Sequence, residues 1–201
     1  MDIGALILMG GKNSRMNGNV KGLLKIKNST FLEKIQETLN DFSSIYLSIN
    51  DKFSEEQKQN FENMGFKIIE DIYKEIGPLG GIYSSLLKCK EEYLFITACD
   101  MPFITKNSIE VLCNKVDKNT DGVVFYDKNN KLYPLGAIYS KNVLPIIEEM
   151  IEKKYYKLSY LIEKSNFVKI NIEKTDIPLK VLSNINTLQE YDLFINNESL
   201  F

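Results

Sequence analysis

A glycine-rich segment with two fixed positive charges follows the first apolar run of the chain. Residues 8–21 read LMGGKNSRMNGNVK, with Gly10 and Gly11 side by side and Arg15 and Lys21 further along. Glycine lets the backbone approach a phosphate closely, and the two cations can balance phosphate charge. The spacing matches neither GxGxxG nor GxxxxGK[ST]. The segment therefore predicts either a different kind of phosphate-binding loop or a plain turn.

Asp100 is the second candidate, because it follows an apolar run at residues 93–98 and Pro102 then stops the strand. A carboxylate at the carboxyl end of such a strand faces the crevice where α/β sheets bind ligands. Nucleotidyl transfer needs a hard cation, and Mg²⁺ is usually held by one or two carboxylates together with substrate phosphates. Asp100 is thus a candidate magnesium ligand, and the alternative is an Asp that caps the next turn.

Two further segments carry weaker signals. Asp71 ends a predicted strand, and GPLGG at 77–81 opens a helix with unpaired amides. This arrangement suits an anion or a sugar, although a simple turn gives the same pattern. Asn184 and Asn186 precede the last helix, where they could orient a ligand, coordinate a metal through oxygen or only cap the helix.

Composition excludes several kinds of chemistry. The sequence contains no histidine, which removes the commonest general base and every Ser-His or Cys-His pair. The net charge of -2 favours neither nucleic acid nor an anionic membrane. Cys89, Cys99 and Cys113 are odd in number and lack CxxC spacing, which argues against disulfides and thiolate metal sites. The apolar run 3–9 is too short to span a bilayer, so we expect a cytoplasmic protein.

The elements that must position these residues alternate in type over the first part of the chain. Expected strands are 4–8, 45–49, 66–70 and 93–98, and expected helices are 30–41, one starting at 54, 77–88 and 107–116. Capping boxes at Thr30 with Glu33 and at Ser54 with Gln57 begin two of the helices. This alternation predicts a mainly parallel sheet with helices on both faces and ligands at the carboxyl ends of its strands.

The second part of the chain is less regular. We expect strands at 123–126 and 132–139 around a turn at 127–130, helices near 142–153 and 158–164, and strands near 167–172 and 179–183. A last helix is capped by Thr187 with Glu190. Neither a repeat nor a linker divides the sequence, so we expect a single domain over residues 1–201.

Taken together, the four segments resemble the molybdenum cofactor guanylyltransferase family. Its pattern is an N-terminal LAGGxSxRMGxxK, a mid-chain GPLAG, a CDxP and a late NxNTPxxL, and the order and spacing agree over nearly the whole chain. Met9 replaces the alanine of the family, Asn17 a glycine and Leu188 a proline, while Val20 stands where an acidic or polar residue is frequent. None of these changes removes a charge that the chemistry needs.

The resemblance implies a Rossmann-like three-layer domain of the nucleotide-diphospho-sugar transferase type. Residues 1–118 would form the nucleotide-binding half and residues 119–201 the acceptor-binding half. The implied reaction transfers GMP from Mg-GTP to the phosphate of molybdopterin, or molybdenum cofactor, and releases pyrophosphate. Molybdoenzymes or their chaperones would receive the product. We expect a monomer or weak homo-oligomer that binds neither nucleic acid nor membranes.

The resemblance also assigns residues. GTP would be bound by Leu8, Met9, Gly10, Gly11, Lys21, Asn50, Asp71, Gly77, Pro78, Leu79 and Asp100. Arg15, Lys21 and Asp100 would be catalytic, with Asp100 on the magnesium, and Asn184 and Asn186 would support the acceptor or the metal. Ser48 is an alternative to Asn50, because the alignment there depends on a one-residue gap. Candidates for an acceptor phosphate are Lys131, Tyr133, Lys141, Lys153 and Lys154, with solvated lysines as the alternative.

Other functions are compatible with the same segments. A cytidylyltransferase for the same cofactor, or a sugar-phosphate nucleotidyltransferase, would share the fold and the loop. Gly10 with Gly11, where cytidylyl relatives usually carry Ala-Gly, and the GPLxG segment favour guanine. A non-catalytic GTP-binding accessory factor is the third possibility, against which the retention of Lys21 and Asp100 speaks.

Overall fold

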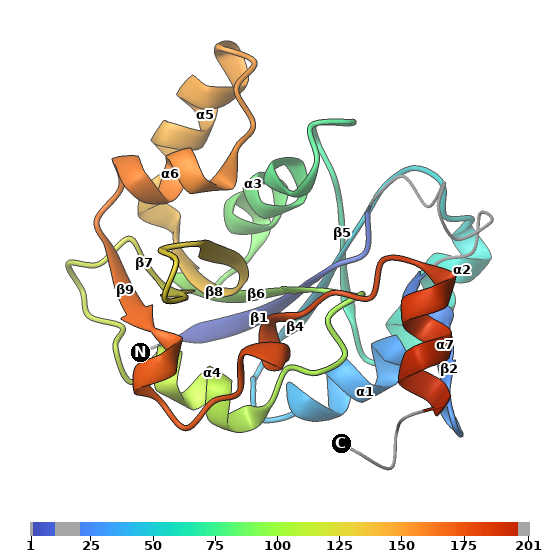
Figure 1. Cartoon of the computed structure of the whole chain (residues 1–201). Helices are drawn as coiled ribbons and strands as arrows, with labels where there is room; N and C mark the ends of the chain where they lie inside the picture. The colour runs from blue at the N-terminus through green and yellow to red at the C-terminus, as the bar shows by residue number, and fades with distance from the viewer. Residues whose placement is uncertain (1, 11–20, 197–201) are drawn as a thin grey trace.

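A seven-stranded sheet forms the middle layer of the protein (Figure 1). The computed structural model describes residues 2–10 and 21–196. The strand order is β5 (Lys67–Glu70), β4 (Ile45–Ile49), β1 (Ile3–Leu8), β6 (Tyr93–Ala98), β8 (Leu132–Ser140), β7 (Gly122–Tyr126) and β9 (Phe167–Asn171). Neighbouring strands pair in parallel except at β8, which is antiparallel to both β6 and β7. The mainly parallel α/β sheet expected from the sequence is confirmed.

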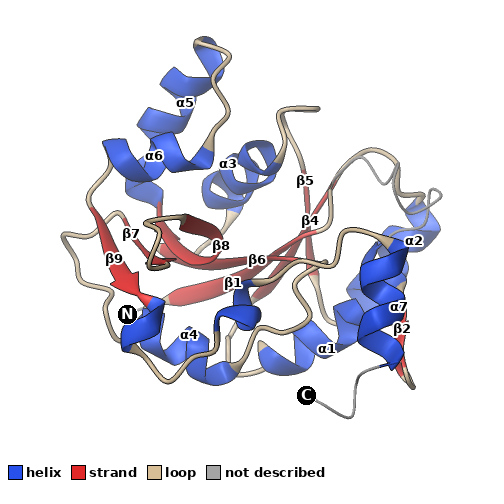
Figure 2. Cartoon of the chain, in the orientation of Figure 1, coloured by secondary structure: helices blue, strands red, loops and turns tan. Residues whose placement is uncertain are grey.

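Helices cover both faces of this sheet. They are α1 (Phe31–Thr38), α2 (Glu55–Asn63), α3 (Pro78–Lys88), α4 (Lys106–Cys113), α5 (Leu144–Glu152), α6 (Leu158–Lys164) and α7 (Leu188–Asn196). Figure 2 shows α3, α5 and α6 on the upper side of the sheet and α1 and α4 on the lower side, which gives three layers. Within residues 2–10 and 21–196, no helix has the length and apolar character that crossing a membrane requires.

Burial and capping explain why these segments form these elements. Every residue of β6 is buried, and in β1 only Ile3 is partly exposed. Parallel strands that are covered on both faces carry such unbroken apolar runs. All three predicted caps are confirmed, since the Thr30, Ser54 and Thr187 side chains accept the N–H groups of Glu33, Gln57 and Glu190 at 3.2, 3.3 and 3.1 Å.

The strand expected at 179–183 is wrong, because the chain there forms a 3₁₀ helix, η5 (Leu179–Leu182). Val181 N–H donates to the Pro178 carbonyl at 3.0 Å, and Ser183 N–H donates to the Lys180 carbonyl at 2.9 Å. Val181 and Leu182 are both buried although they are adjacent, whereas a strand would point them to opposite faces. Short-range bonds and burial together therefore favour the helical turn.

Other differences are small. α1 and α4 end at Thr38 and Cys113, about one turn before the expected ends at 41 and 116. A two-stranded hairpin, β2 (Lys25–Ile26) with β3 (Ser29–Thr30), was not expected, because strands of two residues leave no periodic pattern. The hairpin follows a single 3₁₀ turn, η2 (Lys21–Leu23), which begins at the predicted phosphate-binding lysine.

Strand register aligns the candidate residues along one edge of the sheet. In β1, Leu8 is opposite Ser48 of β4 and Ala98 of β6. Asp71 comes directly after β5, and its N–H donates to the Ile49 carbonyl at 3.0 Å. The parallel strands thus bring Ser48, Asp71 and the segment leading to Asp100 to the same carboxyl-terminal edge, where sheets of this kind bind ligands.

Candidate active site

Lys21 and Asp100 form the centre of the site. The ammonium nitrogen Nζ of Lys21 lies 2.9 Å from Oδ2 of Asp100 and 2.7 Å from Oδ1 of Asn186. Asn184 donates from Nδ2 to the other carboxylate oxygen of Asp100 at 3.1 Å. The lysine and aspartate side chains are only 15% and 14% exposed. We call Lys21, Asp100, Asn184 and Asn186 the lysine–aspartate cluster.

Three segments that lie far apart in the sequence supply this cluster. Asp100 follows β6, where Met101 N–H donates back to the Ala98 carbonyl at 3.0 Å and turns the chain out of the sheet. The Asp100 carbonyl in turn accepts the N–H of Ile185 at 2.8 Å, which fixes the segment that carries both asparagines. Lys21 enters from η2. The backbone bond between Ile185 and Asp100 therefore supports the side-chain contacts of the cluster.

The charges of the lysine–aspartate cluster suit a phosphorylated ligand with a hard cation. Each carboxylate oxygen of Asp100 accepts one hydrogen bond and keeps lone pairs for a metal ion. Among the residues described, no group of three or more His, Cys, Asp or Glu side chains could hold a metal alone. A cation here would therefore be held by Asp100 together with ligand phosphates, as Mg²⁺ commonly is.

Ser48 and Asp71 form a second polar pair on the same edge of the sheet. The Ser48 hydroxyl donates to Oδ1 of Asp71 at 2.6 Å. Burial raises the pKa of Asp71 above its usual value, while the Ser48 hydrogen bond and the charge of Lys88 act in the opposite direction. The carboxylate is thus desolvated without being neutralised, so it would gain from N–H or O–H donors on a ligand.

The start of α3 closes around this pair. A Cβ atom at Gly81 would lie 2.5 Å from the Ser48 hydroxyl and 2.8 Å from Cδ2 of Leu8, so only glycine fits. Gly77 precedes the helix with φ of 68°, a conformation that favours glycine, and Pro78 follows at a position where its missing N–H costs nothing. Gly77 and Pro78 are exposed and Leu79 is buried, so Leu79 offers a ligand only backbone groups.

The remaining predicted residues of the glycine-rich segment fall into three groups. Leu8 and Met9 are 6% and 4% exposed and pack in the core, so they too would contact a ligand through backbone atoms. Gly10 is exposed beside Asp71, with Oδ2 3.3 Å from where a Cβ would stand. Gly11 and Arg15 lie outside the described residues, and their roles stay predictions.

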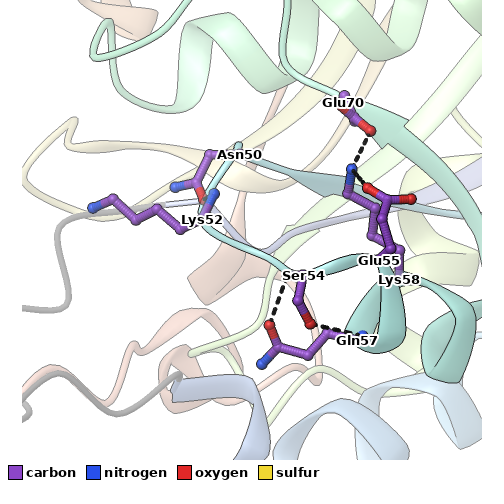
Figure 3. A network of polar contacts seen from close by, with 7 residues as sticks. All are labelled: Asn50, Lys52, Ser54, Glu55, Gln57, Lys58 and Glu70. Carbon is purple, nitrogen blue, oxygen red and sulfur yellow. Dashed lines mark hydrogen bonds and ion pairs between the residues drawn. The ribbon is translucent and has the colours of Figure 1, made fainter.

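The structure places the two alternatives at the end of β4 in different surroundings. Ser48 contacts Asp71, whereas Asn50 accepts the N–H of Lys52 at 3.2 Å in a local turn. In Figure 3, Asn50 lies beside a separate surface network in which Lys58 bridges Glu55 and Glu70 at 2.7 and 2.6 Å. The surroundings of Ser48 thus suit a ligand contact better than those of Asn50, and which of the two contacts the nucleotide stays a prediction.

A pocket of about 510 Å³ adjoins the lysine–aspartate cluster on the side of β8 and η5. It contains both cluster asparagines and the predicted acceptor residues Lys131 and Tyr133, and Lys131 Nζ lies 4.9 Å from the centre of the Tyr133 ring. Lys141 instead donates to the Cys89 carbonyl at 2.8 Å, and Lys153 pairs with Glu149 beside a different pocket, between α5 and α6. Of the five acceptor candidates, Lys131 and Tyr133 therefore line the pocket beside the cluster, whereas Lys141 and Lys153 do not. Lys154 lines neither pocket.

Comparison with known proteins shows the family and the fold. A family model described as the MobA-like NTP transferase domain matches residues 5–167. A probable molybdenum cofactor guanylyltransferase from Clostridium perfringens is 35% identical, with 98% of each chain covered. The structure of molybdopterin-guanine dinucleotide biosynthesis protein A from Archaeoglobus fulgidus superposes with a TM-score of 0.80 at 23% identity, over 98% of this chain and 99% of that one. A 4-diphosphocytidyl-2C-methyl-D-erythritolsynthase from Anaerococcus prevotii shares the fold, with a TM-score of 0.69 at 14% identity over 99% and 96% of the two chains. The chain therefore belongs to the MobA-like NTP transferase family of nucleotidyltransferases.

Proposed function

We propose that this protein transfers GMP from Mg-GTP to the phosphate of molybdopterin, giving the guanine dinucleotide cofactor and pyrophosphate. The observation that carries the proposal is the position of the lysine–aspartate cluster. It lies on the same sheet edge as the Ser48–Asp71 pair and shares Asn184 and Asn186 with the pocket beside β8. Relatives named as guanylyltransferases for the same cofactor support the choice of substrates.

Asp71 is proposed to bind the guanine base. Guanine presents the N1–H and N2–H₂ donors side by side, which matches the two acceptor oxygens of the Asp71 carboxylate. Cytosine presents mainly acceptors on the corresponding edge and would leave the Asp71 charge unpaired. A buried charge without a partner is costly, so the pair formed with Ser48 favours GTP over CTP.

Asp100 is proposed to hold the magnesium ion together with the phosphates of GTP. The fit rests on its hard oxygen donors, its low exposure and the lack of a competing cluster of ligands in the described residues. The ion would supply charge neutralisation at the transferring phosphate. Lys21, held beside Asp100, would balance charge on the leaving pyrophosphate, and Arg15 is expected to help.

The chemical step requires little of the protein beyond positioning and charge. An oxygen of the molybdopterin phosphate attacks the α-phosphorus of GTP, a new P–O bond forms, and the bond to the β-phosphate oxygen breaks. Because a phosphate monoester is already ionised near neutral pH, no general base is needed, in keeping with the missing histidine. Positioning and electrostatic stabilisation then supply the catalysis.

The pocket beside β8 and η5 is proposed as the acceptor site. Its volume, about 510 Å³, lies in the range that accommodates small organic ligands. Lys131 offers a positive charge and Tyr133 an aromatic face, and the lining also includes Asn184, which contacts Asp100, and Asn186. An acceptor phosphate placed near the asparagines would therefore face the nucleotide. Delivery to molybdoenzymes or their chaperones, a monomeric or weakly oligomeric state and a cytoplasmic location remain predictions from the sequence.

The test is a calorimetric titration of GTP, CTP, UTP and ATP in the presence of Mg²⁺, followed by a pyrophosphate-release assay with molybdopterin. We expect selective, magnesium-dependent binding of GTP that weakens in Asp100→Ala, and pyrophosphate release only when molybdopterin is added. Asp41→Ala is a matched control, because Asp41 pairs with Lys106 at the surface, away from the predicted site. Preference for CTP would contradict the assignment of guanine, and binding without turnover would indicate an accessory factor.

A further inference from the structure

Glu190 makes a contact that a helix cap alone does not require. In α1, α2 and α4 the residue three positions after the cap accepts, among backbone groups, only the N–H of the capping residue itself. In α7, one carboxylate oxygen of Glu190 accepts the Thr187 N–H at 3.0 Å and also the Asn186 N–H at 2.6 Å. Asn186 is the residue whose side chain contacts Lys21. The cap of α7 therefore extends one residue further, into the active site.

The next residue of α7, Tyr191, bonds the helix to the hairpin that follows Lys21. The Tyr191 hydroxyl donates to the Lys25 carbonyl at 2.6 Å, and its ring lies 6.0 Å from that of Phe31. Phe31, Ile26 and Ile185 form a small apolar cluster separate from the main core, against which Tyr191 packs. The start of α7 is thus bonded both to the segment that carries Asn186 and to the hairpin that follows Lys21.

We propose that Glu190 is a positioning residue, which fixes the backbone of Asn186 so that the side-chain oxygen Oδ1 of Asn186 holds the Lys21 ammonium beside Asp100. This inference deepens the proposed function and rests on it for the identity of the reaction. Without the bond from Glu190, the Asn186 backbone can rotate, and the Lys21 ammonium loses one of its two partners. The backbone N–H groups of Asn186 and Thr187 also lower the pKa of Glu190 below its usual value.

The experiment compares Glu190→Ala and Glu190→Gln, with Glu33→Ala as the matched control. Glu33 closes the capping box of α1 in the same way but has no bond to the lysine–aspartate cluster. The first readout is the rate at which an amine-acetylating reagent labels Lys21 in ligand-free protein, followed by peptide mass spectrometry. We expect roughly a tenfold faster labelling in Glu190→Ala, the effect of one lost charged hydrogen bond. Glu190→Gln should restore the wild-type rate, because its amide oxygen can accept the same N–H groups.

The second readout is kcat for pyrophosphate release in a double-mutant cycle with Asn186→Ala. Glu190→Ala should lower kcat by roughly tenfold, and it should have no further effect once Asn186 is already alanine, because coupled residues are not additive. Glu33→Ala should lower the melting temperature without changing labelling or kcat. Unchanged Lys21 labelling in Glu190→Ala, or effects of Glu190 and Asn186 that multiply, would overturn the proposal. If the wild-type protein shows no turnover, the proposed function fails, while Lys21 labelling still decides the role of Glu190.

Discussion

Asp71 and Asp100 stand on the same edge of the sheet, directly or nearly after strands β5 and β6, yet their surroundings differ. Asp100 contacts a lysine and an asparagine amide, so its charge is balanced within the protein. Asp71 contacts a serine hydroxyl, and burial raises its pKa. The surroundings of Asp100 suit a site that takes up a metal ion together with ligand phosphates. The second is a desolvated carboxylate, which gains when a ligand brings donors.

The difference assigns separate tasks to the two ends of the site. A balanced cluster can accept a metal and phosphates without a large change in net charge, which favours rapid chemistry. A desolvated carboxylate discriminates between ligands, because a ligand without matching donors leaves it unpaired. Substitutions at Asp100 should therefore act mainly on turnover, and substitutions at Asp71 mainly on the choice of nucleotide.

The largest effect is expected for Asp100→Asn. The amide keeps the size of the side chain but loses the negative charge that would hold the metal and face Lys21. We expect kcat to fall by about three orders of magnitude, the scale seen when a central electrostatic contact is removed. Pyrophosphate release measures the effect, and the melting temperature should change little. Asp41→Asn, in the surface pair with Lys106, should retain full activity, and a similar loss there would deny Asp100 a special role.

Lys21→Ala should have the next largest effect. Removing the ammonium leaves Asp100 without its balancing charge and frees the Asn186 oxygen. We expect about a hundredfold loss in kcat/KM, which corresponds to about 3 kcal/mol of transition-state stabilisation. Steady-state kinetics with varied GTP measure it, and Lys106→Ala is the matched control, since that lysine pairs with Asp41 at the surface. An effect on GTP affinity alone, with kcat unchanged, would remove Lys21 from the chemical step.

Local sequence signals predicted the positions of both carboxylates at strand ends, while their roles were expected from the family resemblance. Residues 93–98 are apolar except for Thr97, which marks a buried parallel strand, and residues 66–70 are apolar at three of five positions, so Asp100 and Asp71 were expected just beyond strand ends. Capping boxes likewise fixed the starts of α1 and α2. These features depend on neighbours within a few residues, which is why sequence alone could predict them.

Contacts between distant segments could not be predicted in this way. Asn186 and Lys21 are 165 positions apart, and nothing in either segment specifies that α7 packs beside the hairpin after Lys21. The family resemblance indicated that both residues belong to the site, but not that they touch. The wrong strand at η5 has a similar origin, since a short apolar run after Pro178 does not distinguish a strand from a 3₁₀ turn.

Asp71→Asn tests the discriminating end of the site. The amide offers guanine one acceptor where the carboxylate offers two, so GTP should bind roughly tenfold more weakly, with kcat at saturating GTP little changed. Because the folded protein raises the pKa of Asp71, stability should fall as pH rises through that pKa, and GTP affinity should rise over the same interval. Asp71→Asn should abolish both dependences and raise the melting temperature. Calorimetry and thermal unfolding between pH 4 and about 8 measure them, and a loss of kcat equal to that of Asp100→Asn would contradict the division of tasks.

The smallest effect is expected at the start of α3, where Gly81→Ala would press a methyl group against Ser48 and Leu8. The clash should cost about 1–3 kcal/mol of stability and displace the Ser48 hydroxyl from Asp71, which weakens GTP binding severalfold without lowering kcat. Ser85→Ala, one turn further along the same helix, is the matched control. The Ser85 Oγ is buried and has no hydrogen-bond partner among the described residues. Removing this hydroxyl should therefore leave the stability equal or slightly higher. Urea unfolding and GTP titration of both variants separate the two sites. If Gly81→Ala lowered kcat as strongly as it lowered affinity, the two carboxylates would be coupled through the sheet edge, and the charge-balanced and discriminating regions would have to be treated as one.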